Sequence, residues 1–466
     1  RCADRPLGAC RECVVNFEVG ATAGRRRAGE TPAVDDPVGH DAPVGTMTAP
    51  GGSTGRQAAW NYLVFALCKS STLIMTIVVA RLLDPAEFGL FALALLVVNL
   101  FDYVKDLGVG AALVQSRRDW HGIAPTALLL SSAFGVLASA TLAGTAGFSA
   151  QLLGHAELAQ PIRVLAIGLG ISAAAAVPAA WVRRQMSFSS RLVPEFAGAL
   201  AKTGVTIALA AAGHGVWSLV YGQLAAAILT AALYWITARA PLGIGFDAAE
   251  ARLLIRFGLP VTALTLLAFA IYNVDYLSVG TRLGTTELGL YTLAYRLPEL
   301  VILNLCVVIS EVLFSALSRL QHDRAGLAAH YRQVLVVVVA LTTPIGVGMA
   351  LGADAAIGTM YGAAYASAGP ILTILAIYAL VYSVSFHAGD VFKAVGRPGV
   401  LTAINAGKFA VLIGPVWWAA GRSAVLVAAV LLAVEVVHCV VRLVIVSRMT
   451  GLRAPALLGA VATPLL

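Results

Sequence analysis

The dominant pattern along the chain is a series of long apolar stretches separated by short polar segments. Twelve stretches are about 20 residues long, the length that a helix needs to cross the roughly 30 Å hydrocarbon core of a bilayer. They are predicted at 58–80, 87–107, 123–147, 162–182, 194–213, 215–237, 256–280, 287–314, 333–353, 369–390, 400–420 and 424–447. Continuous apolar runs exclude a membrane barrel, whose strands alternate apolar and polar residues.

Composition supports an all-α integral membrane protein. Hydrophobic residues make up 59% of the 466 residues and charged residues only 12%, with a mean hydropathy of +0.84. Soluble domains carry about twice that share of charge. The net charge is +8, but no soluble basic domain is recognisable, so a nucleic-acid partner is not expected. Surplus Lys and Arg instead predict loops that face anionic membrane lipid.

Basic residues alternate between successive loops. Six loops hold fifteen of them: Arg117, Arg118, Arg183, Arg184, Arg191, Arg239, Arg252, Arg256, Arg319, Arg324, Arg332, Lys393, Arg397, Arg448 and Arg453. The intervening loops hold four: Arg81, Arg163, Arg282 and Arg422. Because cytoplasmic loops are enriched in Lys and Arg, the richer set and the N-terminus are predicted to be cytoplasmic.

The two ends of the sequence differ from the membrane region. Residues 1–55 are rich in Gly, Pro, Asp and Arg, which predicts a disordered tail. Met47 reads well as a native start, which would make the preceding residues an extension of the reading frame; the alternative is a genuine cytoplasmic tail. The single CREC pair of the tail is weak evidence for zinc. Residues 451–466 are predicted to be a partial thirteenth helix or a truncated end.

An internal repeat divides the membrane region. The segment EFGLFALA (Glu87–Ala94) matches ELGLYTLA (Glu287–Ala294) at five of eight positions with an offset of 200 residues. A weaker match relates Leu152–Ile167 to Met360–Ile377. Two pseudo-symmetric six-helix bundles are therefore predicted, at 56–240 and 241–450. Parallel repeats of this kind occur in transporters.

Several charged residues fall within the predicted spans, where an unpartnered charge costs a few kcal/mol or more. They are Lys69, Lys202, Asp275, Arg296, Glu299, Lys408 and Glu435. Lys69 and Lys202 lie in the middle of their spans with no acid close by in their own helix, which favours a position facing a cavity. Arg296 and Glu299 are spaced to pair. Asn99, Asp102 and Asp106 share a helix face with Lys105 nearby, and the sequence favours an interfacial cluster for them.

No catalytic or metal-binding motif stands out. The eight histidines are scattered, and neither HExxH, GxSxG nor a GxxxxGK[ST] phosphate loop occurs. We therefore expect no enzyme activity, no cofactor and no metal site.

Two motifs resemble those of a known family. The stretch ARLLDPAEFGLFALALLVVNLFDYVKDLGVGAALVQ is similar to the opening of the lipopolysaccharide-biosynthesis flippases of the polysaccharide transporter family. The stretch NVDYLSVGTRLGTTELGLYTLAYRLPEL matches the corresponding motif in the second half. The resemblance covers roughly residues 56–450. It implies the fold of the multidrug/oligosaccharidyl-lipid/polysaccharide exporters, in which two six-helix lobes form a V around a cavity.

The resemblance also implies an activity: movement of undecaprenyl-pyrophosphate-linked oligosaccharide units across the bacterial inner membrane for lipopolysaccharide or exopolysaccharide synthesis. Glycosyltransferases and a polymerase would be the pathway partners. On this hypothesis, cations line the substrate cavity, neutral side chains bind sugar, and an acid couples transport to H⁺ or Na⁺. The candidates are Lys69, Lys202, Arg296 and Lys408 for the lining, Thr265, Tyr272 and Asn273 for sugar, and Asp275 or Glu299 for coupling.

Three alternatives stay open. A cation-coupled multidrug antiporter of the same superfamily would share the fold but favour acidic residues in the cavity. A membrane polymerase or glycosyltransferase would need a large external loop, and no loop between the predicted spans exceeds roughly 20 residues. A non-transporting scaffold would not need charges in the middle of its spans.

Overall fold

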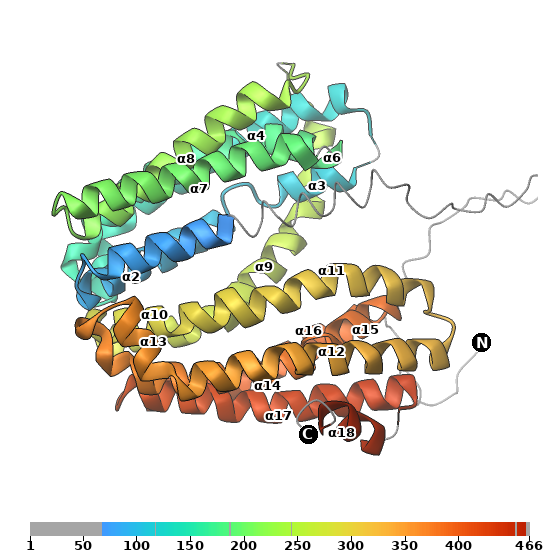
Figure 1. Ribbon diagram of the computed structural model, residues 1–466. Coiled ribbons are helices and arrows are strands. Elements are labelled where there is room, and N and C mark those ends of the chain that lie inside the picture. Colours follow the sequence, from blue (N-terminus) through green and yellow to red (C-terminus); the bar gives the residue numbers. More distant parts are fainter. Residues whose placement is uncertain (1–67, 117, 186–187, 244, 453, 463–466) are drawn as a thin grey trace, which may run out of the picture. The chain divides into compact units, whose positions relative to one another are not determined.

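The computed structural model describes residues 68–116, 118–185, 188–243, 245–452 and 454–462, which form helices joined by short turns (Figure 1). The first half contains α2 Pro85–Asp102, α3 Val109–Gln115, α4 Trp120–Leu152, α5 Ala159–Ala174, α6 Ala176–Arg184, α7 Phe188–Ala211 and α8 Val216–Ala238. The second half contains α9 Ala248–Arg282, α10 Thr285–Pro298, α11 Asn304–Arg319, α12 Arg324–Leu351, α13 Ala353–Met360, α14 Gly369–Phe386, α15 Ala388–Ala394, α16 Pro398–Ala419, α17 Ala424–Thr450 and α18 Ala454–Ala462. No strand occurs among the described residues, and the all-α prediction is confirmed.

Eleven helices among the described residues are long and apolar enough to cross a membrane, and they match the predicted spans from 87–107 to 424–447. Of the predicted first span, the structure describes the shorter apolar helix Cys68–Ala80. Residues 58–67 and the tail 1–55, with its CREC pair, lie outside the described residues. The short helix α18 occupies the predicted partial span at 451–466.

Three predicted spans are interrupted where a continuous helix was expected. The span 162–182 divides into α5 and α6 at Ala175, because Pro178 has no N–H for the carbonyl of Ala174. The span 369–390 divides at His387. In the span 287–314, α10 ends at Pro298 and a π-helix, η2 (Glu299–Leu303), precedes α11. Such π-helical turns are frequent at functional sites.

The first turn of α2 is closed by its own side chains. Asp84 and Glu87 form a reciprocal capping box, in which the Asp84 backbone N–H donates to Glu87 Oε2 at 3.1 Å, and Pro85 occupies the first turn. The other end of α2 differs from the predicted span 87–107, because the helix ends at Asp102 and the chain turns before α3. In this turn Gly108 adopts the left-handed conformation (φ 72°), which glycine adopts readily.

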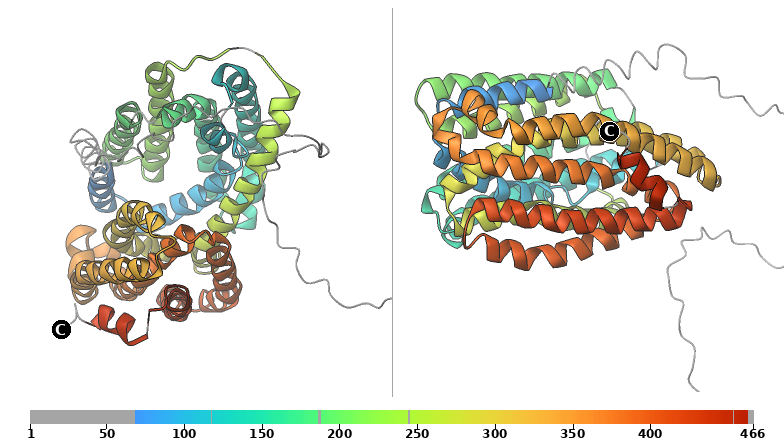
Figure 2. Two further views of the ribbon diagram at one scale, coloured as in Figure 1. Left: turned by 90° about the vertical axis from the view of Figure 1, so that its right-hand side faces the viewer. Right: turned by 60° about the horizontal axis from the view of Figure 1, so that its bottom comes forward.

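The helices pack in two groups (Figure 2). In the first group, α4 packs on α5, and α8 packs on α5 and α7; in the second, α14 packs on α12 and α17, and α17 packs on α16. The helices α2 and α10 form the most extensive contact between the groups. The long helix α9 touches α3 and α4 of the first group and α10 and α16 of the second. The predicted boundary at residues 240/241 stays a prediction.

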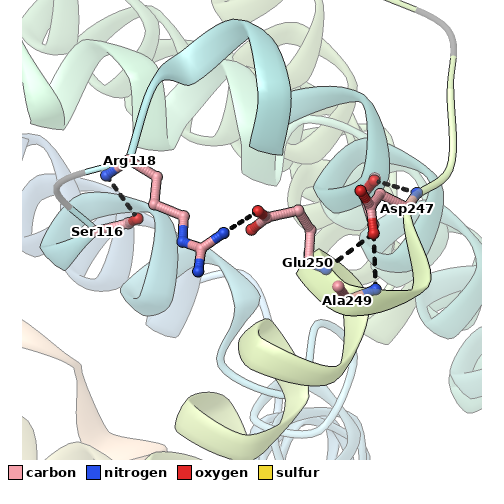
Figure 3. Close-up of polar contacts among 6 residues, drawn as sticks. Ser116, Arg118, Asp247, Ala249 and Glu250 are labelled. Carbon is pink, nitrogen blue, oxygen red and sulfur yellow. Dashed lines mark hydrogen bonds and ion pairs between the residues drawn. The ribbon is translucent and has the colours of Figure 1, made fainter.

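The start of α9 is fixed to the first group by polar contacts (Figure 3). The Asp247 carboxylate accepts hydrogen bonds from the backbone N–H groups of Ala249 and Glu250 at 2.7 and 3.3 Å, so it caps the helix. Glu250 forms an ion pair with Arg118, whose own backbone N–H donates to Ser116 Oγ at 3.2 Å. These contacts attach α9 to the turn between α3 and α4.

The two copies of the sequence repeat contact each other where α2 crosses α10. A Cβ added to Gly89 would lie 1.7 Å from the Thr285 carbonyl oxygen, and one added to Gly289 would lie 1.8 Å from the Pro85 carbonyl oxygen. Gly89 and Gly289, like Pro85 and Thr285, differ by the repeat offset of 200, so the contact is reciprocal, as at a two-fold axis. Small residues are what allow two membrane helices to approach this closely.

The two groups also contact each other at the end of the bundle whose loops hold few basic residues, among them Arg81 and Arg282. We call it the arginine-poor end. Tyr365 Oη donates a hydrogen bond to the Leu83 carbonyl at 2.9 Å, and His155 Nε2 lies 3.3 Å from the Gly280 carbonyl. The Arg81 guanidinium reaches two carbonyls at the end of α13. Each group therefore contributes a loop that touches the helix end of the other.

We predict that Gly89→Ala and Gly289→Ala each destabilise the protein, because each methyl group would overlap the backbone of the facing helix. Overpacking of this kind costs about 1–3 kcal/mol. The double variant should cost less than the sum of the two single costs, since one separation of the helices relieves both overlaps. Thermal unfolding of the purified protein in detergent measures all three.

Gly144→Ala in α4 is the matched control, because no atom lies within 4 Å of a Cβ built at Gly144. It should leave the unfolding temperature unchanged or slightly higher. Strictly additive losses at Gly89 and Gly289 would show that the two glycines do not share one contact.

Candidate functional site

A cavity of about 790 Å³ lies between α2, α3, α5, α6, α8 and the first half of α9. Small residues make room for it: Gly168 on α5 and Ala227 on α8 leave space where larger side chains would meet. The polar side chains that line it include Asn99, Asp102, Lys105, Asp106, Ser172, Arg183, Gln223, Thr230, Tyr234, Thr262 and Thr265. The polar face at the end of α2 thus lines a cavity, and the interfacial position expected from the sequence stays a prediction.

The charges on this face are neutralised locally. Lys105 Nζ lies 2.7 Å from Asp102 Oδ1 and donates a second hydrogen bond to Ser172 Oγ at 2.9 Å. Asp106 accepts hydrogen bonds from the backbone N–H groups of Gly108 at 3.1 Å and Gly110 at 3.3 Å, so its carboxylate holds the turn that leads into α3. These pairings let a lysine and two carboxylates remain within a largely apolar bundle.

Three of the predicted cations are half-buried, and two of them come from helices that approach each other. Lys69 lies on the helix Cys68–Ala80 and Lys202 on α7; both are half-buried. These helices meet nearby, where Ser71 Oγ and Thr203 Oγ1 are 2.9 Å apart. Arg296 of α10 is also half-buried, and its guanidinium forms an ion pair with Glu299. Lys202 and Arg296 belong to different groups of helices.

Lys408, the fourth predicted cation, has a different environment. It is 9% exposed and forms an ion pair with Glu435 of α17, whose other oxygen lies 3.2 Å from His438 Nδ1. Its ammonium also lies 5.8 and 5.9 Å from the ring centres of Tyr378 and Tyr382. Because this charge already has a partner, less of it is available to a ligand.

The candidate coupling acids are also partnered. Glu299 lies 3.1 Å from Arg296 in an ion pair at the start of η2. Asp275 is buried and accepts a hydrogen bond from Tyr291 Oη at 2.7 Å. Its hydrogen-bond partner is thus a phenol of α10. Asp275 and Glu299 therefore occupy separate sites in the second group.

The predicted sugar-binding residues all lie on α9, but they differ in position. Thr265 lines the cavity, although its hydroxyl donates to the Val261 carbonyl at 2.9 Å. Tyr272 is 53% exposed. The Asn273 amide donates to the Phe269 carbonyl at 2.8 Å.

Sequence reasoning missed Ser172, Gln223 and Thr262 as cavity residues. Each is a neutral polar residue in a mostly apolar helix. A neutral polar residue in a predicted span was the only available signal, and many such residues simply bond their own helix. Within the described residues, no cluster of His, Cys, Asp and Glu has the composition of a metal site.

Comparison with known proteins identifies relatives of this chain. A family described as "Polysaccharide biosynthesis protein" matches residues 78–370. The lipopolysaccharide biosynthesis protein WzxC of Escherichia coli (strain K12) is 23% identical over 353 residues, which cover 75% of this chain and 72% of WzxC. The succinoglycan biosynthesis transport protein ExoT of Rhizobium meliloti (strain 1021) is 24% identical over 364 residues, covering 76% of this chain and 72% of ExoT.

Solved structures share the fold. The lipid II flippase MurJ in an inward closed conformation matches with a TM-score of 0.70 and 12% identity, over 87% of this chain and 91% of MurJ. An inward-facing multidrug resistance MATE family transporter of the MOP superfamily matches with a TM-score of 0.67 and 16% identity, over 82% and 94% of the two chains. Both likenesses confirm the predicted exporter fold of a multi-pass membrane protein. The family match extends over more than half of the sequence, so the chain belongs to the polysaccharide biosynthesis protein family.

Proposed function

We propose that this protein is a flippase that moves undecaprenyl-pyrophosphate-linked oligosaccharide units from the inner to the outer leaflet of a bacterial inner membrane. Membership of the polysaccharide biosynthesis family supports an export role for polysaccharide precursors. The observation that carries the finer proposal is the presence of half-buried cations, Lys202 on α7 and Arg296 on α10, within a bundle of apolar helices, together with Lys69 on a helix that meets α7 at the Ser71–Thr203 contact.

A sugar pyrophosphate cannot cross hydrocarbon unaided, because an isolated ionised group loses its hydration there at a cost of tens of kcal/mol on an idealised estimate. The ammonium of Lys202 and the guanidinium of Arg296, which is shared with Glu299, would provide the compensating charge. Guanidinium and ammonium groups both bind phosphate oxygens, Arg often through two parallel hydrogen bonds. Lys69, on the adjoining helix, adds a third positive charge. The lipid tail remains in the bilayer while the head passes between the two groups of helices.

Glu299 gives this arrangement a means of coupling. Its carboxylate competes with a bound pyrophosphate for Arg296, 3.1 Å away. Protonation of Glu299, or its binding of Na⁺, would free the guanidinium for substrate. Asp275, bonded to Tyr291, is the second candidate for this role.

The remaining features of the proposal follow from the same chemistry. The arginine-rich loops and the N-terminus face the cytoplasm, where the lipid-linked unit is assembled, and glycosyltransferases and a polymerase act before and after transport. The protein itself makes or breaks no covalent bond. A multidrug antiporter would favour acids over cations at the positions of Lys202 and Arg296, so it is the weaker alternative.

We predict that Lys202→Gln and Arg296→Gln each weaken binding of undecaprenyl pyrophosphate by the purified protein at least tenfold. A charge-assisted hydrogen bond contributes about 1.5–3 kcal/mol, and 1.4 kcal/mol is a tenfold change. Glu299→Gln should act in the opposite direction and tighten binding, because it removes the competitor for Arg296. Titration of the lipid into the protein in nanodiscs measures the three affinities.

Arg422→Gln serves as the control, since Arg422 stacks on Trp418, 3.8 Å from the ring centre, at the arginine-poor end. Its affinity should match the wild type. Wild-type affinity in the Lys202 and Arg296 variants, or full glycan export by a Lys69→Ala/Arg296→Ala double variant in a strain lacking its own copy, would remove the cationic lining from the proposal.

Two variants distinguish a structural role of the Lys408–Glu435 pair from a role in transport. Lys408→Met alone should destabilise the protein by about 3–5 kcal/mol, because it leaves a buried carboxylate without its ion partner. Adding Glu435→Leu should recover most of that loss. Recovered stability with recovered export would restrict Lys408 to a structural role; recovered stability without export would place its charge in the substrate path.

A further inference from the structure

The cavity of the first group has the size and extent of a ligand site. Its volume of about 790 Å³ falls within the roughly 300–1,000 Å³ typical of sites for small molecules. It reaches from Leu95, in the middle of α2, to Gln115 and Arg183, at the ends of α3 and α6. A ligand could therefore enter between the ends of these helices and reach the middle of the bundle.

The charge of the cavity selects a neutral ligand. Four charged residues line it, two acids (Asp102 and Asp106) and two bases (Lys105 and Arg183), so their formal charges cancel. Lys105 is committed to Asp102 and Ser172, and Asp106 to backbone N–H groups. Because the four formal charges sum to zero, the lining as a whole favours neither a pyrophosphate nor an organic cation.

Hydrogen-bonding groups without a charge are available instead. Asn99 and Gln223 bring side-chain amides, each able to donate and accept. Thr262 is 4% exposed, and its Oγ1 is itself buried and has no hydrogen-bond partner among the described residues, although a threonine in a helix can bond its own backbone. A buried hydroxyl without a partner costs about 1–3 kcal/mol, so a turn of this side chain toward a ligand hydroxyl would recover that amount. Tyr103 adds an aromatic ring at 40% exposure.

We propose that this cavity is a saccharide subsite, which binds the sugar part of the transported head. The inference rests on the proposed function and deepens it. A sugar matches the cavity because it is neutral, carries many hydroxyl groups that both donate and accept, and has apolar C–H faces that suit the Gly and Ala walls and the Tyr103 ring.

The position of the cavity relative to the cations fits one substrate bound across both. Gln223 follows Gly222, which packs against the backbone carbonyl of Lys202, 3.1 Å from a Cβ built on the glycine. The saccharide subsite and the proposed pyrophosphate site are thus on neighbouring helices, α8 and α7. The cations hold the constant part of the substrate, while the cavity contacts the part that differs between glycans.

The test compares bare undecaprenyl pyrophosphate with the same lipid carrying glucose, galactose or N-acetylglucosamine, singly or as disaccharides. The ligands are titrated into the full-length protein in nanodiscs. At least one sugar-bearing lipid should bind tenfold or more tightly than the bare lipid. Gln223→Leu and Thr262→Val should abolish that gain and leave the affinity for the bare lipid unchanged.

Thr145→Val on α4 is the matched control, because Thr145 lies outside the cavity and its hydroxyl bonds the Thr141 carbonyl at 2.7 Å. It should retain the gain. A gain that survives in both cavity variants overturns the subsite, as does the absence of a gain from every sugar. Unfolding temperatures equal to the wild type exclude a folding defect.

Free disaccharides of the same sugars separate this inference from the proposed function, because they carry no lipid pyrophosphate. Weak binding to the wild type that Gln223→Leu removes supports the cavity even if the protein binds no bare lipid, an outcome that would refute the flippase proposal alone. Binding of bare lipid without any effect of sugar would refute the saccharide subsite alone.

Discussion

The structure depends on one constraint: hydrocarbon cannot solvate a charge or an unbonded backbone group. Helices satisfy the backbone internally, which is why the described residues are so nearly all helical. Charges within the bundle are held by partners, as Lys408 is by Glu435 and as Asp390 is by Ser310 Oγ at 2.7 Å. A membrane bundle that keeps charged groups must therefore either pair them or give them a ligand, and both solutions occur in this chain.

The two groups of helices use these solutions differently. In the second group, the acids Asp275 and Glu435 have partners on neighbouring helices, which leaves that interior self-contained. The first group instead surrounds a cavity whose lining charges cancel. Half-buried cations occur in both groups, Lys202 in the first and Arg296 in the second. A substrate with an anionic link and a neutral head would meet complementary chemistry at each place.

Hydropathy was sufficient to predict the spans, because the length of an apolar run reports directly on the thickness of the membrane. The repeat was also legible, since its glycine and glutamate recur at a fixed offset. The breaks at Ala175 and His387 were not predicted. The span 162–182 contains Pro178, but a proline in a membrane helix can kink the helix without ending it. Pairing across helices was beyond the sequence: Lys408 and Glu435 were both noted, but nothing in a hydropathy pattern says that α16 and α17 present those positions to each other. Gln223 and Thr262 were overlooked for the same reason.

The reciprocal crossing of Gly89 and Gly289 has a consequence for the ancestry of the fold. If the two halves descend from one duplicated gene, this glycine once touched its own copy in a second, identical chain, and a single substitution would have altered both sides of the contact together. After fusion each half can mutate separately, yet a bulkier residue in either still meets the other's backbone. On this ancestry, substitutions at the contact between the two repeats are expected to be slower than substitutions elsewhere in them.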